Sequence, residues 1–349
     1  MELRKNNLFK RLFVPNRKRK EWIWGYFLVA PTIIGLIILN IIPIFQVLKM
    51  SFYKSGDFGR NDIFIGFENY IRLLGDEQVW QATINTLKYT FFVVPLNVII
   101  ALILATILNK KIKGRDIYRT IYFIPMVATP AAITMVWKWL YNTQFGLINH
   151  LLGKIGIPKI DWINDPKIAI YSIIIIGVWS TIGYSMVLIL AGLQEIPKDY
   201  YEAATIDGAN SVNQFFNITL PLVSPTLFFV IVTNIIQSMQ VFDVIYMMID
   251  ITSPAYDKTV SLVYLFYNNA FKYSDKGYGS TIIILLLIII LIFYSIVGVP
   301  IIIFNNNYYW DPDIFLFIIY YFIKFIIIFY LYLYYIINYI VYTLFILYN

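Results

Sequence analysis

The chain has 349 residues, of which 60% are hydrophobic and 13% are charged, and its formal net charge is +7. A soluble domain carries about a quarter charged residues, so this composition indicates a membrane protein. The absence of cysteine, the single histidine His150 and the lack of a G-x-x-x-x-G-K-[ST] motif exclude disulfides, thiolate chemistry, a histidine-rich metal site and a recognisable ATP site.

The first feature in chain order is a basic block at residues 1–21, which holds eight of the 27 lysines and arginines. The block directly precedes an apolar run. A basic segment beside a membrane span acts as a topology determinant and attracts anionic lipid, so membrane lipid, and not nucleic acid, is the expected partner. The apolar run is too long for the core of a signal peptide, and it is expected to remain as a membrane anchor.

Six segments are apolar and long enough to cross a bilayer as helices, which takes about 20 residues. We therefore expect an all-α membrane protein with a polytopic domain at 22–303 and its core at 80–300. Prolines inside the spans predict kinks at Pro31, Pro43, Pro95, Pro125 and Pro130. The expected spans are 23–48, 84–108, 120–141, 168–192, 223–249 and 280–303.

The distribution of lysine and arginine predicts the orientation. With the N-terminus in the cytoplasm, the inner segments carry fourteen of these residues, and the outer loops 51–83, 142–167 and 250–279 carry nine. The positive-inside rule favours this orientation. The loop 195–222, between the fourth and fifth spans, then faces the cytoplasm.

This loop is polar and rich in small residues, unlike the spans on either side. Pro197 suits the start of a helix, so a short helix is expected over 198–206. Asp207-Gly208 predicts a turn, and a second helix is expected from about Ser211, a favourable cap. Two short helices joined by a bend would project towards a partner. On these features alone, an ordinary polar connection is an equal alternative.

The spacing in this loop resembles the EAA motif of membrane subunits of bacterial ABC importers: Glu-Ala-Ala, three residues, Gly, nine residues, Ile, one residue, Leu-Pro. The stretches PMVATPAAITMVWKWLYNTQFGLINHLL (125–152) and QVFDVIYMM (240–248) resemble the carbohydrate-importer branch of the maltose and multiple-sugar type. We call residues 195–222 the EAA loop. The residues expected to couple it to an ATPase are Glu202, Ala203, Ala204, Asp207, Gly208, Ile218, Leu220 and Pro221.

The resemblance covers roughly residues 20–295 and implies a six-helix type I ABC importer transmembrane domain in a bacterial cell membrane. It implies that this chain holds no cofactor and hydrolyses no ATP, since two ATPase subunits bind ATP and Mg²⁺ and move the EAA loop in an alternating-access cycle. It also implies a second, related permease subunit and an extracellular or lipid-anchored binding protein that delivers a sugar or oligosaccharide.

The expected substrate path runs along spans four to six. Polar side chains at membrane depth face a cavity or another helix, and helix–helix contact is the alternative for them. In span four, Trp179 and Tyr184 can stack on a sugar or pack in the core. The candidates of span five and its outer end are Asn234, Gln237, Ser238, Gln240, Asp243 and Tyr246.

Two stretches depart from the family pattern. Residues 250–259 read DITSPAYDKT where members often carry Thr-x-Gly-Gly-Pro, so this outer loop is expected to differ in shape. The tail at 304–349 is a low-complexity hydrophobic segment rich in Ile, Tyr and Phe. It is either a seventh span over 314–345 or the product of a frameshift near Val297 in AT-rich DNA.

A secondary transporter or channel that works without an ATPase is the alternative function. It would be expected to show inverted repeats and buried carboxylates near mid-membrane, and no clear repeat is visible. A membrane-embedded enzyme is a third class, but the spans contain no close carboxylate pair or nucleophile motif.

Overall fold

The computed structural model describes residues 17–56, 62–110 and 112–304, the side chains of 17–23 and 296–304 excepted. The basic residues before Arg17 and the predictions for residues 305–349 lie outside this part of the chain. The described residues fall into two units, one with residues 17–49 and one with residues 50–304.

In the first unit the described residues form one helical run. The helices α2 (Arg17–Leu36) and α3 (Ile42–Met50) are joined by the π-helical turn η2 (Ile37–Ile41). From Trp24 to Met50 the run is long and apolar enough to cross a membrane, which confirms the first predicted span. Its large apolar side chains are mostly exposed, as a helix that faces lipid requires.

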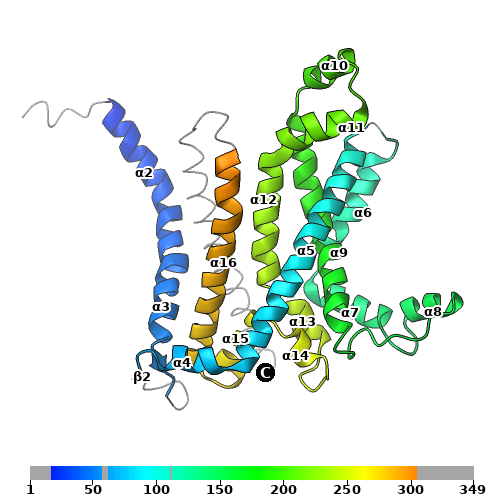
Figure 1. The fold of residues 1–349 in the computed structure, drawn as a ribbon. Coiled ribbons are helices and arrows are strands. Elements are labelled where there is room, and N and C mark those ends of the chain that lie inside the picture. Colours follow the sequence, from blue (N-terminus) through cyan, green and yellow to red (C-terminus); the bar gives the residue numbers. More distant parts are fainter. Residues whose placement is uncertain (1–16, 57–61, 111, 305–349) are drawn as a thin grey trace, which may run out of the picture. The chain divides into compact units, whose positions relative to one another are not determined.

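Three long helices form the centre of the second unit: α5 (Glu77–Asn109), α9 (Ala169–Glu195) and α12 (Leu220–Met239) (Figure 1). The helix α9 packs along α5 and also contacts α12 and α6 (Arg115–Val127). Buried apolar side chains from α5, α9 and α12 form a core cluster near the EAA loop. Its members are Ala101, Ala105, Leu108, Ile182, Met186, Ile189, Leu190, Leu193, Val223, Leu227 and Val230.

The second, fourth, fifth and sixth predicted spans are also confirmed as apolar helical segments long enough to cross a membrane. The second and fourth are α5 and α9, and the sixth is α16 (Lys276–Phe304). The fifth is less regular than expected. The helix α12 stops at Met239, and α13 (Asp243–Met248) follows after a short break.

The third predicted span is not a single kinked helix. The helix α6 and the helix α7 (Pro130–Leu140) are bent by 101° relative to each other. Ala128 and Thr129 between them have extended backbone, which a residue before proline prefers. The Thr129 hydroxyl caps α7 by accepting from the Ala132 N–H at 3.4 Å. The proline therefore separates two helices, whereas the sequence predicted a kink within one.

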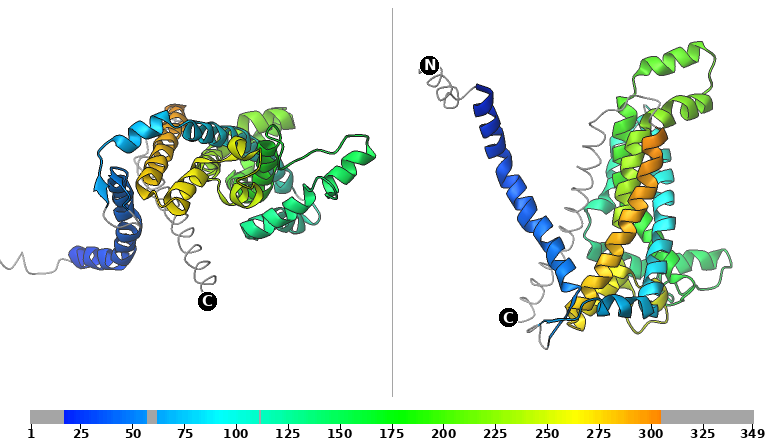
Figure 2. Two further views of the ribbon diagram at one scale, coloured as in Figure 1. Left: turned by 90° about the horizontal axis from the view of Figure 1, so that it is seen from below. Right: turned by 60° about the vertical axis from the view of Figure 1, so that its left-hand side comes forward.

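Short elements gather at the end of the second unit opposite the EAA loop (Figure 1). The two-residue strands β1 (Tyr53–Lys54) and β2 (Ile63–Phe64) pair antiparallel. Figure 2 shows the segment with α7 and α8 extending to the side of the long helices. The other short elements at this end are α4 (Glu68–Gly75), α8 (Leu147–Lys154), α14 (Tyr256–Thr259), α15 (Leu262–Tyr267) and η5 (Asn268–Lys272).

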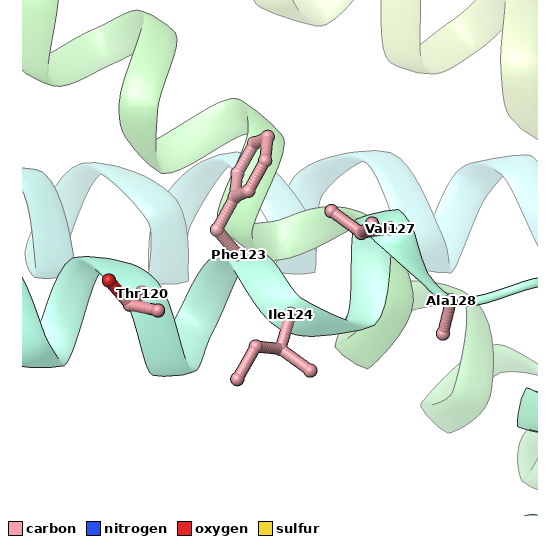
Figure 3. Close-up of a pocket in the computed structure, with 5 residues that line it drawn as sticks. All are labelled: Thr120, Phe123, Ile124, Val127 and Ala128. Atoms are coloured by element: carbon pink, nitrogen blue, oxygen red, sulfur yellow. The ribbon is translucent and has the colours of Figure 1, made fainter.

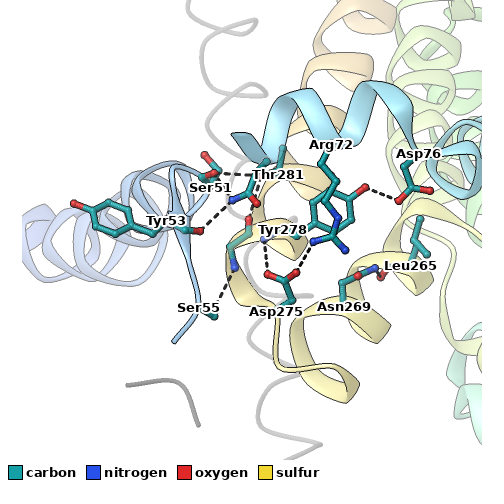
Figure 4. A network of polar contacts seen from close by, with 12 residues as sticks. Ser51, Tyr53, Ser55, Arg72, Asp76, Leu265, Asn269, Asp275, Tyr278 and Thr281 are labelled. Carbon is teal, nitrogen blue, oxygen red and sulfur yellow. Dashed lines mark hydrogen bonds and ion pairs between the residues drawn. The ribbon is translucent and has the colours of Figure 1, made fainter. Parts of the chain in front are cut away.

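A polar network ties α4 to the start of α16 (Figure 4). Arg72 Nη1 donates to Asp275 Oδ2 at 2.7 Å, and the Arg72 guanidinium lies 3.7 Å from the centre of the Tyr278 ring. The Tyr278 hydroxyl donates to Asp76 Oδ2 at 2.5 Å. Since Asp76 caps α5 through the N–H of Gln78, the network fixes the beginnings of α5 and α16 together.

Candidate functional site

The EAA loop contains the predicted helix and turn. The helix α10 (Lys198–Ile206) has the expected bounds. It ends in a Schellman motif, in which the Gly208 N–H donates to Thr205 O at 3.1 Å and the Ala209 N–H to Ala204 O at 2.9 Å. Gly208 has φ 81°, a left-handed conformation that glycine adopts without a Cβ penalty. This confirms the Asp207-Gly208 turn.

The second helix of the loop differs from the prediction in its cap and its length. The helix α11 (Ser211–Gln214) begins at Ser211, but its cap is Asn210, whose Oδ1 accepts from the Asn213 N–H at 2.8 Å. The helix then continues through the π-helical turn η4 (Phe215–Thr219) into α12. The second half of the EAA loop is therefore continuous with the fifth span, and movement of the loop can reach that span directly.

Two side-chain contacts hold the bend between α10 and α11, and sequence reasoning missed both. Gln214 Nε2 donates to Thr205 Oγ1 at 3.0 Å and to Ala209 O at 3.3 Å. The hydroxyls of Tyr201 and Thr219 lie 3.0 Å apart. These side chains meet only because of the angle at which the chain turns after α10. The spacing of residues along the sequence does not give this angle.

The EAA residues divide into an exposed set and a half-buried set. Neither α10 nor α11 contains a buried residue, and Ile206 is 87% exposed. Leu220, together with Ile196 at the other end of the loop, packs against the core cluster. The exposed set is Glu202, Ala203, Asp207, Gly208 and Pro221, and the half-buried set is Ala204, Ile218 and Leu220. The loop thus presents small side chains to solvent and is fixed at its base.

Two polar candidates of span five bridge helices in this structure. Asn234 Nδ2 donates to Ser185 Oγ of α9 at 3.0 Å, and Ser238 Oγ donates to Thr90 Oγ1 of α5 at 3.1 Å. Both candidates are buried. These contacts are those of the helix–helix alternative, so a role of either residue in substrate binding stays a prediction.

The remaining polar and aromatic candidates are spread over several environments. Gln240 is buried, and its Nε2 has no hydrogen-bond partner among the described residues. Gln237 is exposed, while Asp243 and Tyr184 are half-buried. Trp179 is 42% exposed and meets the Trp137 ring edge-on at 5.6 Å.

Tyr246 belongs to an aromatic cluster that the sequence pattern did not reveal. Its ring stacks on Phe242 at 5.1 Å and meets Tyr264 and Tyr267 of α15 at 5.4 and 5.2 Å. The Tyr256 ring contacts Tyr264 edge-on at 5.6 Å, and burial raises the pKa of Tyr256 to about 12. The cluster joins α13 to α15 at the end opposite the EAA loop.

The helix α5 supplies buried polar residues that sequence reasoning also missed. Asn97 Nδ2 donates to Thr181 Oγ1 of α9 at 2.8 Å. Asn85 Nδ2 donates to the backbone oxygens of Asp257 and Val260 at 2.9 and 3.0 Å. The available signal was the recurrence of Asn and Thr at helical spacing inside an apolar span, which indicates a face turned towards protein.

The helix α6 carries an open apolar groove of about 410 Å³ beside its bend into α7 (Figure 3). Apart from the Thr120 hydroxyl, its lining offers no side-chain hydrogen-bonding group of the kind that a sugar needs. The lining residues are Thr120, Phe123, Ile124, Val127 and Ala128.

Comparisons with known proteins agree with this architecture. Residues 97–300 match the family described as binding-protein-dependent transport system inner membrane component. The trehalose/maltose transport system permease protein MalF of Thermococcus litoralis is 34% identical over 79% of this chain and 91% of its own length.

The probable ABC transporter permease protein YesP of Bacillus subtilis is 36% identical over 76% of this chain and 85% of its own. A chain in the crystal structure of a bacterial ABC transporter that imports alginate superposes with TM-score 0.69 at 21% identity, over 84% of this chain and 97% of that chain. The chain belongs to the family of binding-protein-dependent transport system inner membrane components.

Proposed function

We propose that this permease translocates a sugar or oligosaccharide, delivered by an extracellular or lipid-anchored binding protein, together with a second, related permease subunit. The names of similar proteins support the substrate class. Besides the trehalose/maltose permease, they include the sulfoquinovosyl glycerol permease SmoG of Agrobacterium fabrum and the sn-glycerol-3-phosphate permease UgpA of Pectobacterium atrosepticum. These solutes share several hydroxyl groups.

Two partner ATPase subunits drive this transport by closing around ATP and Mg²⁺ and pulling on the EAA loop. The observation that carries this proposal is the loop itself. Its exposed Glu202 and Ala203 lie on a helix without buried residues, and small side chains allow another surface to approach closely. Ile206 is also exposed, and an apolar side chain is more favourably covered by a partner than left in water.

The base of the loop would transmit the pull to the spans. Leu220 and Ile196 pack on the core cluster of α5, α9 and α12, and close-packed interiors transmit displacement because they do not compress. A shift of α10 then carries the fourth and fifth spans, which switches access between the two sides of the membrane.

In this proposal the EAA loop and the N-terminus lie in the cytoplasm. The support is the sequence pattern: the segments that the order of the predicted spans assigns to the same face as the EAA loop carry more lysine and arginine than the other loops, and the positive-inside rule predicts that such segments are cytoplasmic. The loops 51–83, 142–167 and 250–279 then face outward and receive the binding protein. Asn234, Ser238, Tyr246 and Trp179 lie on the helices between the two faces.

The first experiment reverses charge on the EAA loop in the complete importer. Glu202→Lys combined with Gly208→Arg should abolish co-purification with the ATPases and ATP-dependent sugar uptake, because both positions lie on the exposed set. The matched control is Lys113→Glu, a charge reversal of an exposed residue between α5 and α6. Uptake by the double variant at the level of Lys113→Glu would overturn the ATPase proposal.

The second experiment tests orientation. Since the chain has no cysteine, Ala203→Cys and Asp62→Cys can be labelled singly with a membrane-impermeant maleimide. Intact cells should label Asp62→Cys only, and inverted vesicles Ala203→Cys only. The opposite pattern would exclude the proposed topology.

A thermal-shift screen of the cognate binding protein against sugars and glycerol phosphates then identifies the substrate.

A further inference from the structure

The helix α6 is tied to the base of the EAA loop by one glutamine. Gln194, in the last turn of α9, lies between two guanidinium groups of α6. With its amide oxygen turned towards them, Oε1 accepts from Arg119 Nη2 at 3.1 Å and from Arg115 Nη2 at 3.0 Å. This orientation is assigned from the surroundings, since it is the one that pairs donors with an acceptor. Arg115 and Arg119 are one helical turn apart and so face the same side.

Charge makes this contact stronger than an ordinary hydrogen bond. Hydrogen bonds from a charged donor are about twice as strong as neutral ones. Asp116 lies 3.8 Å from Arg119, but its own side chain is 94% exposed, so water screens it. The Arg119 side chain is 28% exposed, and its Nε is buried without a hydrogen-bond partner among the described residues. Gln194 is itself exposed, and its amide oxygen joins both cations to the last turn of α9.

A second contact point makes the attachment of α6 rigid. At Gly183 the backbones of α9 and α6 approach so closely that a Cβ there would lie 1.9 Å from Tyr122 O. Gly183 and Gln194 are eleven residues apart on α9, which corresponds to roughly 16 Å at 1.5 Å per residue. Two points held over this length restrict rotation of α6 against α9.

The place of Gln194 suggests what this attachment does. Gln194 lies three residues before Pro197, where the EAA loop turns into α10. The neighbouring Leu193 and Ile196 belong to or pack against the core cluster. At its other end α6 leads into the 101° bend to α7. Movement of the loop would reach Gln194 before it reaches any residue of α6.

We propose that Gln194, Arg115 and Arg119 form a latch that carries movement of the EAA loop into α6 and so to the bend between Val127 and Pro130. These are positioning residues, since they act through the helices and not on the substrate. The inference rests on the proposed function, because it assumes that partner ATPases move the loop.

The test uses the complete importer in proteoliposomes and measures sugar transported per ATP hydrolysed. Gln194→Leu removes the acceptor at similar size and should lower this ratio about fivefold, the effect of losing a charged hydrogen bond of modest net strength, with ATPase association intact. Gln194→Glu keeps an acceptor and should retain most of the ratio. The control is Gln46→Leu, an exposed glutamine of α3 in the first unit, which should leave the ratio unchanged.

A distance measurement tests the latch even if the Gln194→Leu variant fails to assemble with its partners. Spin labels at Ile117→Cys on α6 and Tyr200→Cys on α10 occupy exposed positions in a chain without native cysteine. With the latch intact, their distance should stay constant between the ATP-free and ATP-bound states. A distance that changes between these states would overturn the latch.

The outcomes separate the inference from the function on which it rests. If Glu202→Lys with Gly208→Arg abolishes uptake but Gln194→Leu matches Gln46→Leu in transport per ATP, only the latch is wrong. If the parent importer shows no ATP-driven uptake, or the double variant has no effect, the proposed function fails and the latch fails with it.

Discussion

The two ends of the second unit are built on opposite principles. At the EAA loop, α10 and α11 have no buried residue, and the bend depends on a few side-chain hydrogen bonds such as Gln214 to Thr205. At the opposite end, contacts such as Arg72 to Asp275 and Asn85 to Asp257 join residues more than 170 positions apart. One end is thus an exposed loop held by few contacts, and the other, which we call the frame, is held by contacts between segments far apart in the chain.

The largest expected effect comes from removing a buried clamp of the frame. Asn85→Leu leaves the backbone oxygens of Asp257 and Val260 without their donor and removes the acceptor for Gln81 Nε2 at 2.9 Å. At about 1 kcal/mol for each hydrogen bond, the free energy of unfolding should fall by about 3 kcal/mol. Thermal unfolding of the purified permease in detergent measures this.

The same substitution at the EAA loop is the control. Asn213 is exposed, so Asn213→Leu should change stability by less than about 0.5 kcal/mol. Equal effects at Asn85 and Asn213 would mean that the two ends do not differ as described.

The next largest effect is expected at the turn of the EAA loop. Gly208→Ala places a Cβ in a left-handed conformation of φ 81°, which costs about 1–2 kcal/mol. The strain should alter the angle between α10 and α11 and reduce ATP-dependent uptake, while thermal unfolding of the spans changes little. Gly208→Asn should recover part of the uptake, because Asn tolerates this conformation better than Ala. Equal uptake by the Ala variant and the parent would show that the turn does not need glycine.

A smaller effect is expected from the polar network of the frame. Arg72→Gln removes the ion pair with Asp275 and the contact with the Tyr278 ring. Since the Arg72 side chain is 53% exposed, solvent screening limits the loss to about 1 kcal/mol. A double-mutant cycle with Asp275→Asn measures the coupling, and additive effects would mean that the ion pair contributes nothing.

The smallest effect should be seen only in dynamics. Tyr201→Phe removes the hydroxyl contact with Thr219 at 3.0 Å, worth about 0.5–1 kcal/mol. Hydrogen exchange of the α10 amides should become faster by about threefold, with unchanged exchange in α9. Faster exchange throughout the unit would instead show that the EAA loop contributes to global stability.

Much of the architecture can be predicted from the sequence, because a lipid environment permits few backbone structures. Backbone groups must pair within a segment, so apolar length alone locates five of the six spans. Pro197 and the dipeptide Asp207-Gly208 likewise locate α10 and its turn, since a left-handed residue after a helix favours glycine. Even so, the cap at Asn210 in place of Ser211 shows that boundaries depend on which side chain reaches the free N–H groups.

The side-chain contacts between helices at the candidate site cannot be predicted from the sequence in this way. The residue pattern marks Asn234 and Ser238 as polar, but cannot decide whether they face a cavity or the partners Ser185 and Thr90 that the structure provides. The same holds for the break at Pro130, where a kink and a 101° bend share one sequence signal.

The sequence by itself determined the membrane class, five of the six predicted spans and the EAA loop, because hydrophobic length and turn chemistry act locally. Only the tertiary structure decided the bend between α6 and α7, the hydrogen bonds from Asn85 of α5 to Asp257 and Val260, and the attachment of Gln194 to Arg115 and Arg119. These depend on the angles at which helices pack, and many side chains far apart in the chain set such angles together.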